Sequence, residues 1–382
     1  MNNSTRKLGL SIALSVLCVA GLFAQGITLP PSGDNQKSIV TQYIGSIASV
    51  TINYNSPDVT APNGADRRGK IWGQLEPYGM NYLGFGTATA SPWRAGANQN
   101  TTITFSHDME VEGKAIKAGT YGLHMIIEKD KPWTLILSNN STAWGSYFYD
   151  AKDDALRVEV QPKEAPYHEW LSYEFIDRKP EFTVAALYWE ELMVPFKISV
   201  PNMNDLYLAK IRNEMEDAQG FNWQNRVAAV QFCLSKNINL QEALTWAEAA
   251  STNSFIGEEN FTTLSTKAGV LTALGKKEEA AKIMDKAINH PTASVFQVHA
   301  YGRQLIAQGE KQKALEVFQF NAKKNPKTWP VNFGLARGYS AVGNYKSALK
   351  YAKLALANAP DQPNKDALTA GIAKLEKGED IN

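Results

Sequence analysis

The feature that most restricts the fold of this chain is a fixed interval between small residues in its second half. Three glycines share a spacing of 34 residues: Gly275, Gly309 and Gly343. Three alanines repeat the same spacing: Ala280, Ala314 and Ala348. A constant period of this length indicates a unit that stacks on copies of itself, because one unit alone cannot bury its apolar face. We therefore predict an all-α array over residues 205–382, built from about four helical pairs.

The residue types at these intervals fit the tetratricopeptide repeat, in which two helices joined by a tight turn occupy 34 residues. Small residues such as Gly302 let the two helices approach closely, and large ones such as Phe318 fill the space between them. We expect the glycine of each repeat to make the turn. Residues 366–377 are then expected to form a capping helix with a polar outer face.

A small basic and aromatic strip repeats with the same period. Arg303 and Arg337 are 34 residues apart, and so are His299 and Phe333, which lie one helical turn earlier on the same faces. We predict that this strip binds a protein or peptide partner through an acidic segment or a chain-terminal carboxylate. The alternative is that these arginines are ordinary solvated side chains on a helix face.

The first half of the chain has a period of two. Segments rich in Val, Ile, Tyr, Phe and Trp, separated by Gly, Pro, Asn and Asp, indicate β-strands. The expected strands are 38–44, 49–54, 101–105, 121–128, 133–137, 156–160, 169–176, 182–189 and 194–200, with a hairpin over 110–116. No long helical period interrupts them, so we predict an antiparallel β-sandwich over residues 35–200. The fold class of the chain is then α+β multidomain, with the sandwich followed by the helical array.

The segment before the third expected strand is the sharpest candidate for a ligand site in this domain. Trp93, Arg94 and Asn98 place an aromatic ring, a guanidinium and an amide within six residues. A guanidinium offers a planar set of donors suited to carboxylate or phosphate, and an amide can both donate and accept. The alternative is that Arg94 and Asn98 hold together the backbone of a long loop, which needs such partners when buried.

His124 is the fourth candidate ligand residue, since a histidine can act as a general base or a metal ligand. A satisfied core histidine is the alternative. The five histidines show no metal-ligand spacing, and Cys233 is the one cysteine left after the N-terminal segment. We therefore expect no metal and no cofactor, and we expect Cys233 to be a buried, inert thiol on an apolar helical face. No motif assigns a catalytic residue.

Five pieces of the first half together resemble one protein family. They are the segments that begin at Arg68 (RGKIWG), Trp93 (WRAGAN), Ala118 (AGTYGLHM), Trp133 (WTLIL) and Trp144 (WGSY). In this order they are similar to domain-of-unknown-function family 2911, a secreted family, over roughly residues 35–200. This chain differs from the family pattern by a Gly/Ala/Thr-rich insertion between Gly79 and Trp93. The resemblance implies secretion and brings no established activity.

The N-terminus has the features of a secretory signal peptide. Arg6 and Lys7 precede an apolar run over 8–23, and Ala24-Gln25 is a plausible cleavage point. We predict that residues 1–25 are removed and that the mature protein is periplasmic or extracellular, without a transmembrane segment. A lipid attached to Cys18 is an alternative that the bulky Leu17 before it disfavours.

Composition argues against two classes of partner. The net charge of +1 over 382 residues gives no indication that the chain binds nucleic acid or an anionic membrane surface, and we expect no nucleic-acid partner. Because repeat arrays hold partners, we interpret the chain as an exported binding or scaffold protein of the cell envelope and expect no enzyme activity. One alternative is that the β-domain is an enzyme, or that it binds a glycan or another small molecule in a polar and aromatic pocket. A third is that the β-domain is purely structural and only positions the array.

Overall fold

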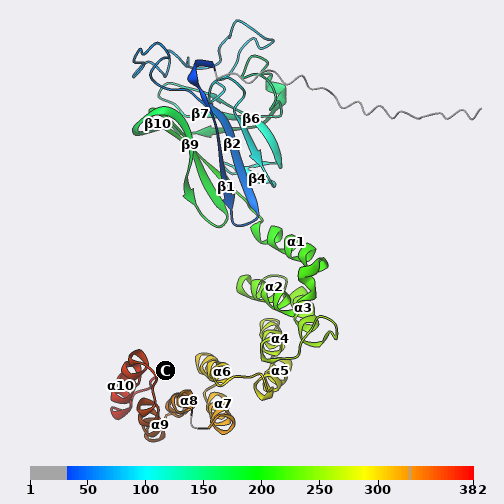
Figure 1. Cartoon of the computed structure of the whole chain (residues 1–382), viewed down its shortest axis with the longest axis vertical. Helices are drawn as coiled ribbons and strands as arrows, with labels where there is room; N and C mark the ends of the chain where they lie inside the picture. Colours follow the sequence, from blue (N-terminus) through cyan, green and yellow to red (C-terminus); the bar gives the residue numbers. More distant parts are fainter. Residues whose placement is uncertain (1–31, 327) are drawn as a thin grey trace, which may run out of the picture. The chain divides into compact units, whose positions relative to one another are not determined.

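The computed structural model describes residues 32–326 and 328–382, so the predicted signal peptide and Cys18 lie outside the described residues. The chain divides into two compact units, Met1–Leu206 and Tyr207–Asn382. The first contains the strands and the second most of the helices (Figure 1). We call them the β-unit and the helical unit.

The β-unit contains two antiparallel sheets. Its strands are β1 (Gln36–Ile44), β2 (Ala48–Ser56), β3 (Thr102–Phe105), β4 (Met109–Val111), β5 (Lys114–Ile116), β6 (Gly119–Ile126), β7 (Trp133–Ser138), β8 (Asp154–Val160), β9 (Lys163–Arg178) and β10 (Phe182–Ser199). The order is β1-β2-β3-β6-β7-β8 in the six-stranded sheet and β5-β4-β10-β9 in the four-stranded sheet. The predicted antiparallel fold is confirmed, and the expected hairpin over 110–116 is β4 and β5.

Alternation of side chains along the strands builds the core between the sheets. In β2, Val50, Ile52 and Tyr54 lie on one face and are buried. The Tyr54 ring meets the Tyr173 ring of β9 edge to face at 4.9 Å between centroids. The Tyr173 backbone N–H donates to the Tyr54 hydroxyl at 3.2 Å. These contacts join the six-stranded sheet to the four-stranded one.

Two strand predictions were wrong. The segments 182–189 and 194–200 are parts of the single strand β10, and β9 begins at Lys163 rather than at 169. The pairing of the two strands shifts register on either side of Glu190, which has a positive φ of 55°. Such a bulge bends a strand without ending it. The Glu190 carboxylate accepts a hydrogen bond from the Gly69 N–H, so a loop holds the bulge.

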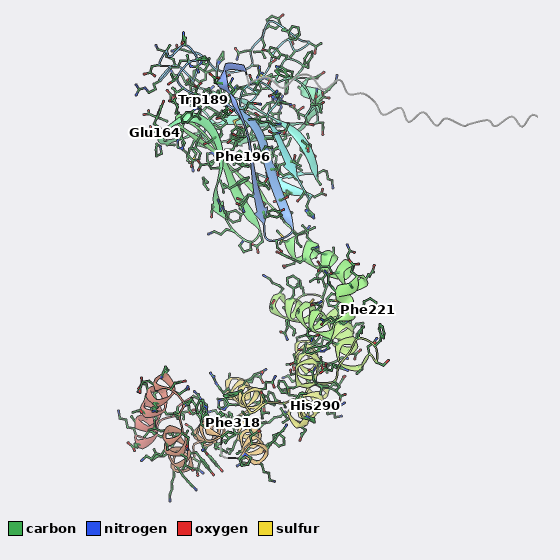
Figure 2. The ribbon with its side chains drawn as sticks, in the orientation of Figure 1. Glu164, Trp189, Phe196, Phe221, His290 and Phe318 are labelled. Atoms are coloured by element: carbon green, nitrogen blue, oxygen red, sulfur yellow. The ribbon has the colours of Figure 1, made fainter. Side chains whose placement is uncertain are left out.

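The long connection between β2 and β3 packs against the sheets through an aromatic cluster. Trp72 from this connection packs against both Trp93 and Trp189, with ring centroids 5.5 and 5.6 Å away. Trp133 of β7 closes the cluster at 5.1 Å from Trp72. Trp189 is fully buried on β10, on the same strand as Phe196 (Figure 2). Burial of such large rings supplies much of the stability of a domain.

The helical unit is a series of antiparallel pairs. The helices are α1 (Met203–Glu216), α2 (Trp223–Lys236), α3 (Leu240–Thr252), α4 (Phe261–Ala273), α5 (Lys277–Asn289), α6 (Val295–Ala307), α7 (Lys311–Lys324), α8 (Trp329–Ala341), α9 (Tyr345–Ala357) and α10 (Gln362–Glu376). Four pairs run from α2 to α9, as predicted. The capping helix α10 begins at Gln362, four residues before the predicted start, because Asp361 caps it through the Asn364 N–H. Cys233 is buried on α2, as expected.

The 34-residue glycines end the first helix of successive pairs. Gly275 and Gly309 have φ values of 79° and 83°, a region that side chains disfavour. The N–H of the residue after each glycine reaches back over the turn, from Lys276 to the Leu271 carbonyl and from Glu310 to the Leu305 carbonyl, both at 2.9 Å. This bond closes the helix end in the Schellman arrangement.

A glycine also permits close packing inside the array. A Cβ added at Gly302 of α6 would lie 2.5 Å from the Phe318 ring. Phe318 is fully buried on α7 (Figure 2).

Within the described parts of the chain, no helix combines the length and apolar character needed to cross a membrane.

Candidate functional site

The β-unit contains a polar cavity of about 390 Å³. Its charged and amide lining residues come from separate segments of the chain: Asn35, Asp58, Arg67, Glu76, Arg94 and Asn98. The Trp189 ring and the Leu75 side chain add apolar surface. A mixture of apolar walls and a few convergent polar groups is typical of small-molecule sites. We call this cavity the arginine pocket.

The segment from Trp93 to Asn98 has a constrained backbone. Trp93 pairs with Met125 of β6 through two backbone hydrogen bonds of 2.9 and 2.8 Å. Ala95 and Asn98 then adopt positive φ values of 48° and 55°. The Ala95 carbonyl accepts hydrogen bonds from the Tyr173 hydroxyl at 2.9 Å and the Thr101 hydroxyl at 3.2 Å. Strained backbone persists where its surroundings hold it, and it is frequent at functional sites.

Arg94 is fixed in this segment by two contacts. Its Nη1 donates to the Asn98 carbonyl at 2.6 Å, and its guanidinium lies 5.0 Å from the centre of the Tyr147 ring. A Cβ at Gly145 would lie only 2.4 Å from Nη1, so the glycine leaves room for the guanidinium. The hydrogen bond to Asn98 uses one of the five N–H donors of a guanidinium.

Arg67 brings a second guanidinium to the pocket. Its Nε donates to the Val59 carbonyl at 3.0 Å, and its Nη2 donates to the Asp58 carbonyl at 2.8 Å. The Asp58 carboxylate lies 3.5 Å from the same Nη2, and both side chains are about one quarter exposed. The Arg67 side chain is therefore positioned mainly by backbone carbonyls.

Glu76 adds a largely desolvated carboxyl to the pocket that the two arginines line. Burial raises the pKa of this carboxyl to about 8, and Arg94, the Trp93 indole N–H and Arg67 offset only part of the rise. The Trp93 indole N–H has no hydrogen bond of ordinary geometry within the described residues. The indole N–H therefore lowers the pKa of Glu76 as a nearby dipole and not through a hydrogen bond. At neutral pH the Glu76 carboxyl is mostly protonated.

The structure brings two of the four predicted ligand residues into the pocket. Arg94 and Asn98 line it. Trp93 instead stacks on Trp189 at 6.1 Å in the aromatic cluster. His124 is 2% exposed, and its Nδ1 lies 2.9 Å from the Ser146 Oγ. Burial, assisted by the charge of Arg94, lowers the pKa of His124 to about 4, so its ring is neutral at physiological pH.

Sequence reasoning missed Arg67 and Glu76. Both lie in the long connection, where no periodic pattern indicates which side chains face inward. One feature of the sequence could have indicated Glu76. It is the acidic residue of the stretch from Ile71 to Gly79, which is otherwise rich in aromatic residues and glycine and lies between two segments that contain arginine.

In the helical unit, three of the four residues of the predicted strip are in contact: His299, Phe333 and Arg337. The Arg337 guanidinium lies 4.5 Å from the centre of the Phe333 ring. The His299 ring lies 6.2 Å from the Phe333 ring, and its Nδ1 is 3.1 Å from the Pro330 carbonyl. Burial lowers the pKa of Arg337, and the neighbouring charge of Arg303 adds to this effect. Arg303 itself is exposed.

Residues 380–382 of the chain lie along α8 beside this strip. The Ser340 hydroxyl donates to the Asp380 carboxylate at 2.7 Å and accepts from the Ile381 N–H at 3.1 Å. The Asn382 amide donates to the Arg337 carbonyl at 3.1 Å. The Ile381 side chain packs against the apolar cluster that includes Ala336. A short C-terminal segment is thus bound through the Ile381 N–H and the side chains of Asp380, Ile381 and Asn382.

Comparisons with solved structures found repeat proteins matching the helical part. The TPR-like repeats of a Podosopora anserina kinesin light chain are 17% identical, with 41% of this chain and 85% of that chain covered and a TM-score of 0.31. YrrB, described as a TPR protein with an unusual peptide-binding site, is 20% identical, with 44% of this chain and 84% of that chain covered and a TM-score of 0.30.

A tetratricopeptide repeat protein from Parabacteroides merdae is 19% identical, with 44% of this chain and 68% of that chain covered and a TM-score of 0.31. The search of curated proteins found no match. The family resemblance of the first half is confirmed, because the model of the family described as "Protein of unknown function (DUF2911)" matches residues 35–198.

Proposed function

We propose that this protein is an exported binding protein whose helical array holds an extended peptide segment on the face formed by Arg337 and Ser340 of α8. The observation that carries the proposal is the position of the chain's own residues 380–382, which already lie on this face. A surface that binds one short segment with specific geometry has the groups needed to bind a similar segment of a partner.

The contacts define the kind of partner. Ser340 contacts both a carboxylate and the next backbone N–H, which favours an acidic residue followed by an extended backbone. The apolar cluster that receives Ile381 favours an aliphatic residue at the second position. Arg337 and the exposed Arg303 add positive charge, which attracts acidic segments. The partner is therefore a protein with an accessible acidic-aliphatic segment.

The proposed export rests on the N-terminal segment, in which two basic residues precede an apolar run. N-terminal sequencing of the protein recovered from its native cells tests this part. A mature chain that begins near Gln25 or Gly26 is expected, and a chain that retains the apolar run contradicts cleavage at this position.

Competition between the chain's own segment and a free peptide tests peptide binding. We would measure fluorescence anisotropy of a labelled peptide of residues 377–382 with two full-length proteins, the wild type and Asp380→Ala/Ile381→Ala. The double variant is expected to bind the peptide at least about tenfold more tightly, because an internal segment competes at a high effective concentration.

Adding Ser340→Ala to the double variant is expected to weaken peptide binding by about tenfold, as for a lost hydrogen bond to a charged group. Lys346→Ala in the same background is the control, since Lys346 is an exposed lysine on α9. Equal affinity of the Ser340→Ala and Lys346→Ala proteins, or equally weak binding by the wild type and the double variant, would rule out this site.

A further inference from the structure

We infer that the arginine pocket of the β-unit is a binding site for a small sugar acid, with Arg94 and Arg67 binding its carboxylate. This inference is independent of the peptide site, because every residue of the pocket belongs to the β-unit. It rests on the size of the cavity, the arrangement of its charged groups and the rigidity of Arg94.

The size of the pocket fits a single sugar ring. A cavity of about 390 Å³ is at the lower end of the range for small-molecule sites. Its apolar surface, from Trp189, Leu75 and two prolines, suits the flat face of a ring. Its polar surface combines N–H donors with the Asp58 carboxylate. A ligand with several hydroxyl groups can use donors and acceptors together.

The charges favour a carboxylate. Asp58 lies beside Arg67 and balances its charge in part. Arg94 has no carboxylate within ion-pair distance among the described residues, although Glu76 is near enough to feel its charge. Because guanidinium groups match the planar geometry of carboxylates, the unpaired charge of Arg94 is the natural position for an anionic group.

The pocket is also preorganised. The Tyr147 ring and the Asn98 carbonyl hold the Arg94 guanidinium before any ligand arrives, in space that Gly145 leaves open. Binding then orders few side chains, which reduces the entropic cost of association.

Glu76 makes the affinity depend on pH. The charged groups that face its carboxyl are Arg94 and Arg67, and Asp58 lies beyond Arg67. Burial raises the pKa of Glu76 to about 8, so the group is mostly neutral at pH 7 and mostly ionised at pH 9. An ionised Glu76 would repel the ligand carboxylate and compete with it for Arg94. Affinity for an anion is therefore expected to fall between pH 7 and pH 9.

Isothermal titration calorimetry with the full chain tests the inference, with D-glucuronate as the probe and D-glucose and acetate as comparison ligands. Glucuronate is expected to bind at least tenfold more tightly than either comparison ligand at pH 7. If glucose binds as tightly as glucuronate, the pocket does not recognise the carboxylate. If acetate binds as tightly, the pocket does not recognise the ring. If glucuronate does not bind measurably, the proposed site is refuted.

Three variants locate the binding. Arg94→Met is expected to lower glucuronate affinity at least tenfold. Arg68→Met is the matched control, because Arg68 is an exposed neighbour paired with Asp66, and it is expected to change affinity less than twofold. Glu76→Gln keeps a neutral side chain of similar shape, so binding at pH 7 is expected to persist and the loss at pH 9 to disappear.

Circular dichroism and thermal melting would establish that each variant is folded. If folded Arg94→Met and Arg68→Met proteins bind glucuronate equally, the ligand does not use the arginine pocket. If the Glu76→Gln protein loses affinity at pH 9 as the wild type does, Glu76 is not the group that sets the pH dependence and the assigned arrangement is wrong.

Discussion

The Arg337 guanidinium lies above the Phe333 ring, 4.5 Å from its centre and one turn later on α8. The same residue contacts Asn382, because the Arg337 carbonyl accepts from the Asn382 amide at 3.1 Å and Arg337 Nη1 lies 3.5 Å from the Asn382 Oδ1. This pair connects the predicted basic and aromatic strip to the segment that occupies α8.

Replacing the ring is expected to weaken peptide binding without unfolding the array. Phe333→Leu in the Asp380→Ala/Ile381→Ala background keeps an apolar side chain and removes the cation–π contact, which is worth roughly 1 kcal/mol when partly buried. We expect peptide affinity to fall about fivefold in anisotropy measurements. Phe296→Leu is the control because Phe296 is an exposed ring on α6, 59% accessible. An equal loss in both variants would argue against a role for the Phe333 ring.

Two helical glycines of the array, Gly302 and Gly269, are expected to respond in opposite ways to alanine. Gly302→Ala forces a Cβ to within 2.5 Å of the buried Phe318 ring and is expected to destabilise the helical unit by about 1–3 kcal/mol. Gly269→Ala on α4 meets only the end of the Leu234 side chain, at 3.6 Å. The free energy of unfolding of the helical unit should therefore rise by up to about 1 kcal/mol, because alanine has the higher helix propensity. Urea denaturation measures the free energy of unfolding of both variants. If both substitutions destabilise the helical unit, crowding by Phe318 is not what makes Gly302→Ala unfavourable.

The tryptophan cluster is expected to dominate the stability of the β-unit. Trp189→Ala removes a fully buried ring that contacts Trp72 and Trp93, with an expected loss of about 3–5 kcal/mol. Trp170→Ala on β9 removes a ring that is 62% exposed, and it should lower the free energy of unfolding of the β-unit by less than about 1 kcal/mol. Denaturation followed by circular dichroism distinguishes the two. Similar losses would show that burial of Trp189 is not what matters.

Acid is expected to destabilise the β-unit through His124. Its folded-state pKa of about 4 lies below the ordinary value of 6.5, so the unfolded chain binds the proton more readily. The contribution of His124 to stability is complete above pH 6.5 and is lost as the pH falls towards 4. It amounts to at most about 3 kcal/mol.

His124→Asn is expected to flatten this part of the stability profile, because asparagine can still bond Ser146 but does not titrate. Denaturation midpoints of the β-unit between pH 7 and pH 4 measure the effect, with His107→Asn as a control at a less buried position. A profile unchanged by His124→Asn would assign the acid sensitivity to other groups.

The sequence predicted the parts of the fold that depend on periodicity. The 34-residue interval predicted the helical pairs from α4 to α9, since a Gly turn recurs at Gly275, Gly309 and Gly343 and a small residue recurs at the position of Gly302. Alternation located most strands, but it could not show that β10 continues through Glu190, because the bulge is held by the distant Gly69 N–H.

The sites were harder to predict because they depend on contacts between distant segments. Arg94 and Asn98 stood out through their residue types alone. Glu76 joins them only because Trp72 anchors the long connection in the aromatic cluster. The contact between Ser340 and Asp380 likewise depends on the chain reversing after α10, and neither residue carries a recognisable motif.

The repeated glycine turns also bear on how such a chain can change length. Gly275, Gly309 and Gly343 have nearly the same φ and the same spacing, so the chain leaves each turn in an equivalent direction. A gene segment encoding the residues between two of these positions could therefore be duplicated or deleted in frame, and the following helix would rejoin the array in register. The turns are natural junctions at which this protein can gain or lose a whole repeat.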